Sequence, residues 1–334
     1  MTRLAAMLAA VIGGGGLLAA QAPAPAVIDL GTLGGPFAYA TAINNRQQVV
    51  GQSVDAAETQ FDAFLWEDGV MRGLSTPELR FQLAQDINDR GQVVGWGQGA
   101  PGSILSLSWQ DGVLTQLPIP PGATYCSPEA INDHGDIVGF CDQRPLPLFT
   151  MWRRTGEVVN VGSVPEGAFA RAVDVTNHGV VLITTEEPGS GRRILLWKDG
   201  VVTDVTNPMW NPTALNERNV IAGWGGTYPE FAAVIVDGVL LALPQAPTHR
   251  RSGAEGINDR GDVVGFDAQD QTLPVVWSDG RRQVLPLPPG STTGNAVDIN
   301  ERGVAIGNYA RMPGETRALL WPKASTRIAP RAPR

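Results

Sequence analysis

The segment "DINDRGQVVG" at Asp86–Gly95 decides how this chain folds, because variants of it recur along the whole sequence. In chain order the copies are "AINNRQQVVG" (42–51), "DINDRGQVVG" (86–95), "AINDHGDIVG" (130–139), "DVTNHGVVLI" (174–183), "ALNERNVIAG" (214–223), "GINDRGDVVG" (256–265) and "DINERGVAIG" (298–307). Their asparagine position, occupied by Thr176 in the fourth copy, advances in steps of 44, 44, 44, 40, 42 and 42 residues. Self-similarity at such a period predicts a repeat protein.

Each repeat contains four segments of strand length. The repeated phrase is followed by a run such as "AFLWEDG" at Ala63–Gly69 and then by a short aliphatic run such as Val70–Ser75. These segments are rich in Val, Ile, Leu and Trp and are separated by Gly, Pro, Asn and Asp, as is typical of short strands joined by turns. Four short strands in roughly 42 residues are typical of one propeller blade. We therefore predict an all-β, seven-bladed β-propeller with four antiparallel strands per blade.

The two ends of the chain predict how the ring closes. The seventh repeat ends near Trp321 without a fourth strand, whereas the orphan segment "VIDLGTL" at Val27–Leu33 resembles that missing strand. Pairing the two would remove exposed sheet edges. The predicted domain therefore covers residues 27–322, with strand 27–33 completing the last blade and the repeated phrase on the innermost strand.

One large apolar side chain per repeat is expected to pack between neighbouring blades. A role as ligand platforms is the alternative. The position is filled by Trp66, Trp109, Trp152, Trp197, Ile235, Trp277 and Trp321.

Residues 1–26 have the composition of a signal peptide. Arg3 supplies a positive start, Leu4–Ala20 an apolar core, and the small residues up to Ala26 a cleavage site. A membrane anchor is the alternative, and the four glycines Gly13–Gly16 argue against it. We expect a bacterial secreted or periplasmic protein without a membrane span after cleavage. Residues 323–334 are basic and Pro-rich and are expected to form a disordered tail.

The charge balance bears on partners and cofactors. With 25 Lys+Arg against 33 Asp+Glu the net charge is −8, and no basic stripe is present, which argues against nucleic acid as a partner. Only three histidines occur, which argues against a His-based triad or a multi-His metal site. We expect no cofactor and a monomeric protein.

The pattern "AIN-x-x-G-x-V-V-G … A-F-L-W-x-x-G", together with "DLGTLGG" at Asp29–Gly35, resembles the HAF repeat of bacterial extracellular proteins. The resemblance extends over nearly all of residues 27–321. The His-Ala-Phe triplet that names the family is reduced here to Asp62-Ala63-Phe64 and Arg317-Ala318-Leu319. The resemblance implies an exported repeat protein and supplies no catalytic residues to carry over.

Aromatic residues follow the glycine that ends the second strand in four repeats, and carboxylates occur in the neighbouring loops. Rings can stack on apolar ligand faces while carboxylates accept hydroxyl or amine protons, so this face is predicted to bind a glycan, a peptide or a protein. The alternative is that the rings pack between blades. The candidate ligand-binding residues are Trp96, Phe140, Trp224, Phe266, Glu186, Glu187, Glu230 and Asp267.

On the innermost strand, Asp86, Asp174 and Asp298 share one position. They are weak candidates for a cation site, and the favoured alternative is that they accept backbone N–H groups of their own turns. At the third turn position a circle of basic residues is expected, either as an anion-binding rim or as a solvated surface. That circle consists of Arg46, Arg90, His134, His178, Arg218, Arg260 and Arg302.

Cys126 and Cys141 flank the third-repeat turn almost symmetrically, which predicts a cross-strand disulfide in an exported protein. A bulge at Gly135 would make the pair diagonal.

These observations favour an exported, non-catalytic propeller that binds a ligand or partner through one loop face. A carbohydrate-active hydrolase or lyase that uses loop carboxylates is one alternative, and a structural envelope protein is another.

Overall fold

The computed structural model of the chain describes residues 27–57, 60–99, 103–143, 148–163, 169–187, 191–206, 209–226, 229–248, 250–312, 314–322 and 324. The predicted signal peptide, residues 1–26, lies outside the described residues. So does the predicted tail, except for Ala324, which is buried and donates its N–H to the carbonyl of Gly303 at 2.9 Å.

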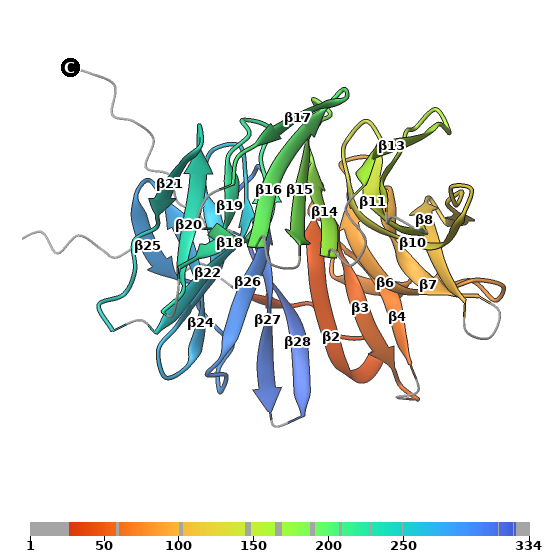
Figure 1. Cartoon of the computed structure of the whole chain (residues 1–334). Helices are drawn as coiled ribbons and strands as arrows, with labels where there is room; N and C mark the ends of the chain where they lie inside the picture. Colours follow the sequence, from red (N-terminus) through yellow and green to blue (C-terminus); the bar gives the residue numbers. More distant parts are fainter. Residues whose placement is uncertain are drawn as a thin grey trace, which may run out of the picture.

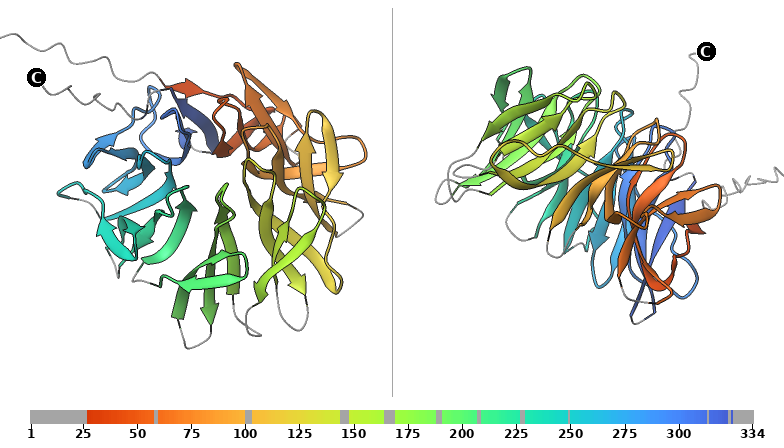
Figure 2. Two further views of the ribbon diagram at one scale, coloured as in Figure 1. Left: turned by 90° about the horizontal axis from the view of Figure 1, so that it is seen from above. Right: turned by 90° about the vertical axis from the view of Figure 1, so that its right-hand side faces the viewer.

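Seven four-stranded antiparallel sheets are arranged as blades around a central axis (Figure 1; Figure 2, left), which confirms the predicted propeller. Blades 1 and 2 consist of β2 (Gly34–Ile43), β3 (Val49–Asp55), β4 (Phe61–Glu67), β5 (Val70–Gly73), and β6 (Arg80–Ile87), β7 (Val93–Gln98), β8 (Ile104–Gln110), β9 (Val113–Gln116). Blades 3 and 4 consist of β10 (Ala123–Ile131), β11 (Ile137–Gln143), β12 (Leu148–Trp152), β13 (Val158–Ser163), and β14 (Phe169–Val175), β15 (Val181–Glu187), β16 (Gly191–Lys198), β17 (Val201–Asp204). Blades 5 and 6 consist of β18 (Met209–Leu215), β19 (Ile221–Gly225), β20 (Phe231–Val236), β21 (Val239–Ala242), and β22 (Arg251–Ile257), β23 (Val263–Ala268), β24 (Thr272–Ser278), β25 (Arg281–Val284).

Blade 7 joins the two ends of the chain. It consists of β26 (Gly294–Ile299), β27 (Ala305–Met312), β28 (Glu315–Trp321) and the N-terminal β1 (Ile28–Asp29). Strand β1 pairs antiparallel with β28, with Ile28 opposite Leu320, and the N–H of Leu30 continues the ladder to the carbonyl of Ala318. The predicted closure is thus confirmed, although only two residues of the predicted segment 27–33 form the strand.

The hydrophobic core is divided into seven clusters, one between each pair of neighbouring blades. Every cluster contains the Trp, or Ile235, of one blade packed against the preceding blade. These side chains are at most 8 % exposed, as expected for wedges between blades. In three blades the indole Nε1–H also donates to a proline carbonyl at the end of the preceding blade, at 2.7 Å: Trp152 to Pro118, Trp277 to Pro244 and Trp321 to Pro286.

The repeated asparagine links each blade to the next. Its side-chain oxygen accepts the N–H groups two and four residues later, as for Arg90 and Gln92 on Asn88. Its amide nitrogen donates to the backbone carbonyl of the equivalent residue in the following blade. Within the described chain these inter-blade bonds, 3.0–3.1 Å long, run from Asn44 to Asn88, Asn88 to Asn132, Asn132 to Thr176, Asn216 to Asn258, Asn258 to Asn300 and Asn300 to Asn44. Thr176 has no amide to donate, so the belt has one gap.

The residue after that asparagine forms a second ring, and this one is complete. Each backbone N–H donates to the side-chain oxygen of the equivalent residue in the next blade, at 2.6–2.8 Å. The order is Asn45, Asp89, Asp133, Asn177, Glu217, Asp259, Glu301 and back to Asn45. The turn residues of the repeated segment therefore stabilise each hairpin and also link all seven blades into a closed ring.

Blade 3 contains the predicted disulfide. Cys126 on β10 and Cys141 on β11 are directly opposite each other, both fully buried, and bonded. The pair is direct rather than diagonal because the bulges of β10 fall on either side of it, between Ala123 and Cys126 and between Pro128 and Ala130. A disulfide is typical of proteins from oxidising compartments.

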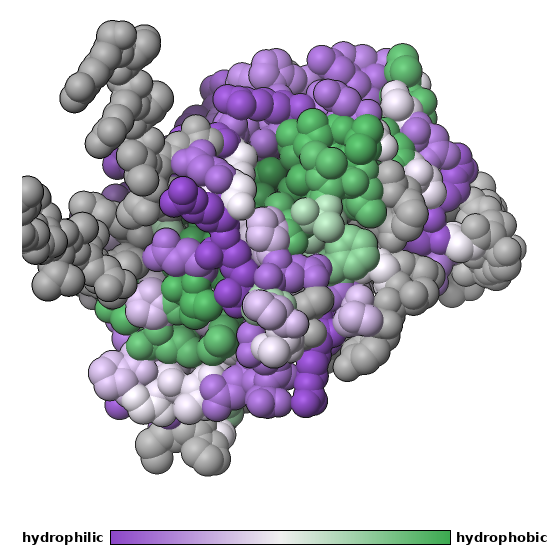
Figure 3. All heavy atoms as spheres, turned by 90° about the vertical axis from the view of Figure 1, so that its left-hand side faces the viewer, coloured by the Kyte–Doolittle hydropathy of each residue, from purple (hydrophilic) through white to green (hydrophobic). Residues whose placement is uncertain are grey.

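The outermost strands carry exposed aliphatic side chains. Figure 3 shows apolar side chains gathered among hydrophilic ones on one flank of the ring. The exposed large hydrophobic residues of these strands include Val70, Val113, Val201, Val202, Val239, Leu241 and Val284. The described residues contain no helix long and apolar enough to cross a membrane.

Candidate functional site

The first strand of every blade contains a β-bulge at the same place. In β10, for example, Pro128 faces Gly139 and Ala130 faces Val138, which leaves Glu129 as the extra residue. The same shift occurs in the other six blades. Bulges re-aim side chains, and here they give each innermost strand one additional side chain beside the central axis.

At the turn end of the axis, Asp86, Asp174 and Asp298 line a cavity of about 220 Å³ together with the two rings of turn residues. Each carboxylate accepts two backbone N–H groups, one from the next residue and one from the following blade. Asp86, for example, accepts from Ile87 and from Ile131, both at 2.7 Å. Asp174 and Asp298 do the same with Val175 and Leu215, and with Ile299 and Ile43. The three aspartates thereby accept one backbone N–H from each of six blades. None of the three accepts the equivalent N–H of blade 6, that of Ile257.

Burial raises the pKa of Asp86 to about 6, against the N–H groups of Ile131 and Ile87, which lower it. Burial likewise raises the pKa of Asp174 and of Asp298 to about 7, and the charge of Asp86 adds to both. All three side chains remain partly exposed to the cavity, so water there screens their repulsion. The sequence favoured bonds to backbone N–H groups of their own turns; each carboxylate accepts one N–H from the next residue and a second, which the sequence did not predict, from the following blade. The described residues contain no group of three His, Cys, Asp or Glu placed to hold a metal ion.

At the opposite end of the axis, the four predicted aromatic residues occupy equivalent positions between blades. Each aromatic residue is on the second strand of its blade, and the residue two positions before it on that strand packs in the hydrophobic cluster shared with the following blade. Val264, two positions before Phe266, packs in this way against blade 7. Because side chains alternate along a strand, Phe266 also points toward blade 7. Trp96, Phe140, Trp224 and Phe266 are each half-buried there, so packing and exposure are combined.

Blades 5 and 6 bring two of these rings together at Gly253. A Cβ added to Gly253 would lie 2.6 Å from the Phe266 ring and 3.2 Å from the Trp224 ring. The glycine therefore leaves the space that both rings use. The guanidinium of Arg251, on the same strand, lies over the Phe266 ring at 5.3 Å from its centroid, in cation–π geometry.

Phe266 and Arg251 form one wall of a pocket of about 500 Å³ that extends over blades 6, 7 and 1. In blade 7 the aromatic position is taken by Asn308, whose amide is anchored to the N–H and carbonyl of Ala40 at 2.8 and 3.2 Å. The shorter side chain leaves room where a ring would otherwise fill the space. The remaining lining residues are Tyr39, Thr272, Thr293, Gly294, Asn295, Tyr309, Ala310 and Thr316.

The predicted carboxylates do not gather in this pocket. Glu186 is exposed and pairs with Arg192 at 2.7 Å, and Asp267 is fully buried against Arg282 at 2.6 Å. Glu230 is half-buried, and its backbone carbonyl accepts the N–H of Ser252 at 3.0 Å. The side chain of Glu187 lies outside the described residues. Of the seven predicted ligand-binding residues whose side chains the structure describes, Phe266 alone lines this pocket.

The sequence analysis did not identify a cluster of charged residues, Glu129, Arg171 and Glu255, on the innermost strands. Glu129 and Glu255 occupy bulge positions, and Arg171 of blade 4 pairs with Glu129 at 3.2 Å. Burial raises the pKa of Glu255 to about 7, and the charge of Arg171 opposes this. The signal in the sequence is the residue two positions before the repeated "IN", which is Glu in "EAIN" and "EGIN" but Thr in "TAIN".

No protein-family model and no curated protein matches the chain. Solved structures do match it in fold. One is the β-propeller domain of the Trilobed protease from Pyrococcus furiosus, described as having an open velcro topology, with a TM-score of 0.60 at 10 % identity over 89 % of this chain and 98 % of that one. A second is virginiamycin B lyase from Staphylococcus aureus, with a TM-score of 0.53 at 13 % identity over 89 % and 98 %. A third is TolB from Acinetobacter baumannii, with a TM-score of 0.52 at 15 % identity over 72 % of this chain and 63 % of TolB. At such low identity these likenesses establish a β-propeller and nothing finer.

Proposed function

We propose that this protein is an exported binding module that holds a glycan, without catalysis, in the pocket on the aromatic face. The observation that carries the proposal is the lining of that pocket. Tyr39 and Phe266 offer rings, with Arg251 over one face of Phe266; Asn295 and Asn308 offer amides, and three threonines offer hydroxyls. Sugars are recognised by this combination, because apolar ring faces stack on aromatic side chains while hydroxyl groups bond to amides and hydroxyls.

A glycoside hydrolase would need two carboxyl groups about 5 to 10 Å apart at the scissile bond. The described lining of this pocket contains neither Asp nor Glu. The pocket as described is therefore suited to binding, and the enzymatic alternative would require acids from elsewhere.

The test is a glycan and peptide array probed with the protein after removal of residues 1–26. Arg251→Gln and Phe266→Ala remove a charge and a ring from the pocket wall, and Phe140→Ala removes the equivalent ring in blade 3, away from the pocket. We expect a glycan signal that weakens at least about tenfold in both pocket variants and persists in Phe140→Ala. An empty array from folded protein, or a signal indifferent to both pocket variants, refutes the proposal. Peptide signals alone would replace the glycan by a peptide, which is the second probe because peptidases are among the structural neighbours.

A second candidate function is acid–base catalysis by Glu255 on the innermost strand of blade 6. Burial raises the pKa of Glu255 to about 7, which suits a general acid or base, and Arg171 beside it already pairs with Glu129. The corresponding test is turnover of any array ligand by the native protein and by Glu255→Gln. Equal rates would exclude this role.

Export belongs to the same proposal and is supported by the composition of residues 1–26, the buried disulfide and the HAF-like repeat. N-terminal sequencing of the protein recovered from periplasm or medium of a bacterial host should find a start between residues 21 and 27. An intact N-terminus in the cytoplasmic fraction would contradict it.

A further inference from the structure

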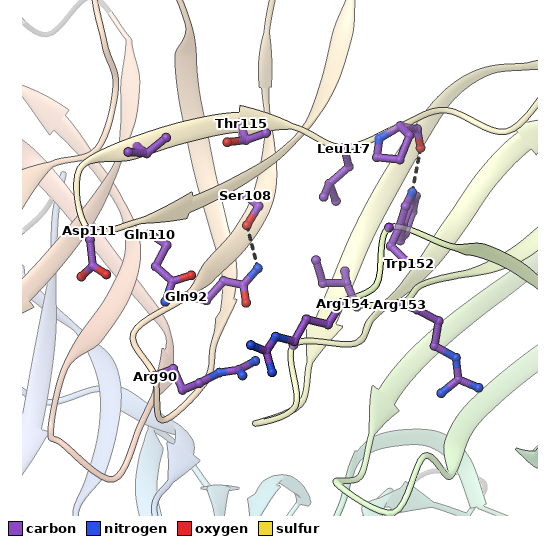
Figure 4. Close-up of a pocket in the computed structure, with 15 residues that line it drawn as sticks. Arg90, Gln92, Ser108, Gln110, Asp111, Thr115, Leu117, Trp152, Arg153 and Arg154 are labelled. Carbon is purple, nitrogen blue, oxygen red and sulfur yellow. Dashed lines mark hydrogen bonds between the residues drawn. The ribbon is translucent and has the colours of Figure 1, made fainter.

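A groove of about 660 Å³ lies between blades 2 and 3, at the turn end of the strands and therefore on the face opposite the aromatic pocket. Figure 4 shows its polar residues: Arg90 and Gln92 from blade 2, Ser108 and Gln110 from the third strand of that blade, and Arg154 from blade 3. Trp152 of blade 3 also lines the groove, and its indole Nε1–H donates a hydrogen bond to the carbonyl of Pro118 at 2.7 Å.

The turn arginine of blade 2 lacks the partner that the turn arginines of blades 1 and 6 have. In blade 6, Arg260 pairs with the buried carboxylate of Asp262 at 2.9 Å. In blade 1, Arg46 donates to the Gln48 oxygen at 2.7 Å, and the Gln48 amide donates in turn to Glu67 at 2.7 Å.

Blade 2 replaces both acids by amides. Gln92 stands where blade 6 has its aspartate, and Gln110 stands where blade 1 has its glutamate. Gln92 donates to Ser108 at 3.1 Å instead. In the part of the chain that the structure describes, Arg90 makes no ion pair within 4.0 Å, and its buried Nε has no hydrogen-bond partner.

Blade 3 adds a second guanidinium through an altered turn. Between their third and fourth strands, five other blades use a residue pair Asp-Gly with both residues at positive φ, whereas blade 3 reads "RRTG" at Arg153–Gly156, one residue longer. Arg153 turns to Asp136 and Asp199, at 3.4 and 4.0 Å. Arg154 points instead into the groove, toward Arg90 (Figure 4), and it too has no ion pair among the described residues.

The position of Arg90 is set by its neighbour in blade 3. Gly135 has φ of +86°, and a Cβ at that position would lie 2.4 Å from Nη2 of Arg90. The guanidinium of Arg90 therefore occupies space that a side chain at position 135 would fill, as Arg46 does at Gly91.

We propose that this groove is a second ligand site, specific for the acid group of an anionic saccharide. Two guanidinium groups that face each other without a carboxylate between them repel, and a carboxylate or sulfate placed between them removes that repulsion and accepts hydrogen bonds from both. Gln92, Gln110 and Thr115 lie where hydroxyl groups of the same sugar would be. The volume falls in the range of small-molecule sites, and Asp111 is the sole acid in the lining.

The experiment is isothermal titration of the protein, without residues 1–26, with trigalacturonate, a sulfated disaccharide, sodium sulfate and cellotriose. The variants are Arg90→Gln, Arg154→Gln and, as the matched control, Arg302→Gln, which removes the same turn charge from blade 7. We expect trigalacturonate or the sulfated disaccharide to bind, and the stronger of the two identifies the acid group. Each groove variant should weaken binding about tenfold, and Arg302→Gln should leave it unchanged. Added salt should weaken binding to the native protein more than to the variants.

Three results would overturn the proposal: no acidic probe binds, cellotriose binds as well as the acidic probes, or all three variants behave alike. Sodium sulfate binding as tightly as the acidic sugars would reduce the groove to an inorganic anion site. Melting temperature provides a check that does not depend on the ligand. Because the two charges repel, neither groove variant should melt lower than the native protein.

Discussion

The gap in the asparagine belt leads to a prediction that can be worked out from the other six blades. Thr176 accepts the N–H of Val180 at 3.1 Å through its hydroxyl, but it makes neither the second intra-turn bond nor the bond to blade 5. The turn backbone is otherwise that of its neighbours: Gly179 donates to the carbonyl of Thr176 at 3.0 Å, as Gly135 does to that of Asn132. Thr176→Asn should therefore find a site already shaped for asparagine.

The substitution adds two hydrogen bonds, from the N–H of His178 to the new side-chain oxygen and from the new amide to the carbonyl of Asn216. At about 0.5–1.5 kcal/mol for each bond, and with a buried methyl worth about 0.8 kcal/mol lost, the expected net gain is about 0.2–2 kcal/mol. For a chain of this size, that gain corresponds to a rise in melting temperature of roughly 0.5–5 °C. Calorimetry or thermal unfolding followed by circular dichroism measures it.

The mirror-image control is Asn132→Thr in blade 3, which deletes the bonds from His134 and to Thr176 while keeping a hydroxyl for Asp136. It should lower the melting temperature by a comparable amount. If Asn132→Thr destabilises the protein while Thr176→Asn leaves the melting temperature unchanged or lowers it, the reasoning that the belt is equivalent in all blades is refuted.

Two further predictions concern the disulfide and the buried acids. Replacing Cys126 and Cys141 by alanine should cost about 2–4 kcal/mol in denaturant unfolding, because the bridge closes a loop of 15 residues in the unfolded chain; an unchanged midpoint would show that the unfolded chain is not constrained by it. The raised pKa values of Asp86, Asp174 and Asp298 mean that the folded state binds more protons than the unfolded state between about pH 4 and 7. The free energy of unfolding should accordingly fall as pH rises from about 4 to 7, by on the order of 1–2 kcal/mol per carboxylate once screening by cavity water is allowed for, and the melting temperature should fall with it. Asp174→Ala, which installs the residue of blades 1, 3 and 5, should flatten that profile, and a flat profile in the native protein would contradict the assignment.

The sequence predicted the fold well because the forces that build a propeller act identically in every repeat. The phrase around Asn88, the tryptophan wedge and the orphan strand before Leu33 each report a contact that every blade needs, so seven copies reinforce a single interpretation. The disulfide followed from spacing for the same local reason: Cys126 and Cys141 flank one hairpin.

The candidate site was harder to predict because it depends on which side chains different blades bring together. Phe266 and Trp96 look equivalent in sequence, yet Phe266 lines the aromatic pocket and Trp96 does not, since the blade after Phe266 carries Asn308 where a ring would have filled the space. Asp267 resembles a loop carboxylate, but it is fully buried and pairs with Arg282, which lies two strands away in the same blade. Such outcomes depend on packing between segments far apart in the chain, which a repeat pattern does not encode.

The aspartates of the inner strand show why departures from the repeat are the place to look for function. Each aspartate accepts one backbone N–H from its own blade and one from the next, so an alternation of Ala and Asp would supply an acceptor to every blade of an even-numbered ring. A seven-bladed ring must break this alternation. The break is at Gly256, against which Asp298 packs. A residue that is repeated in most blades thus has a structural role in joining the blades into a ring. A ligand without sevenfold symmetry must be recognised by what differs between blades. The two proposed sites lie at such differences: the Asn308 that opens the aromatic pocket, and the Arg154 turn that faces an unpaired Arg90.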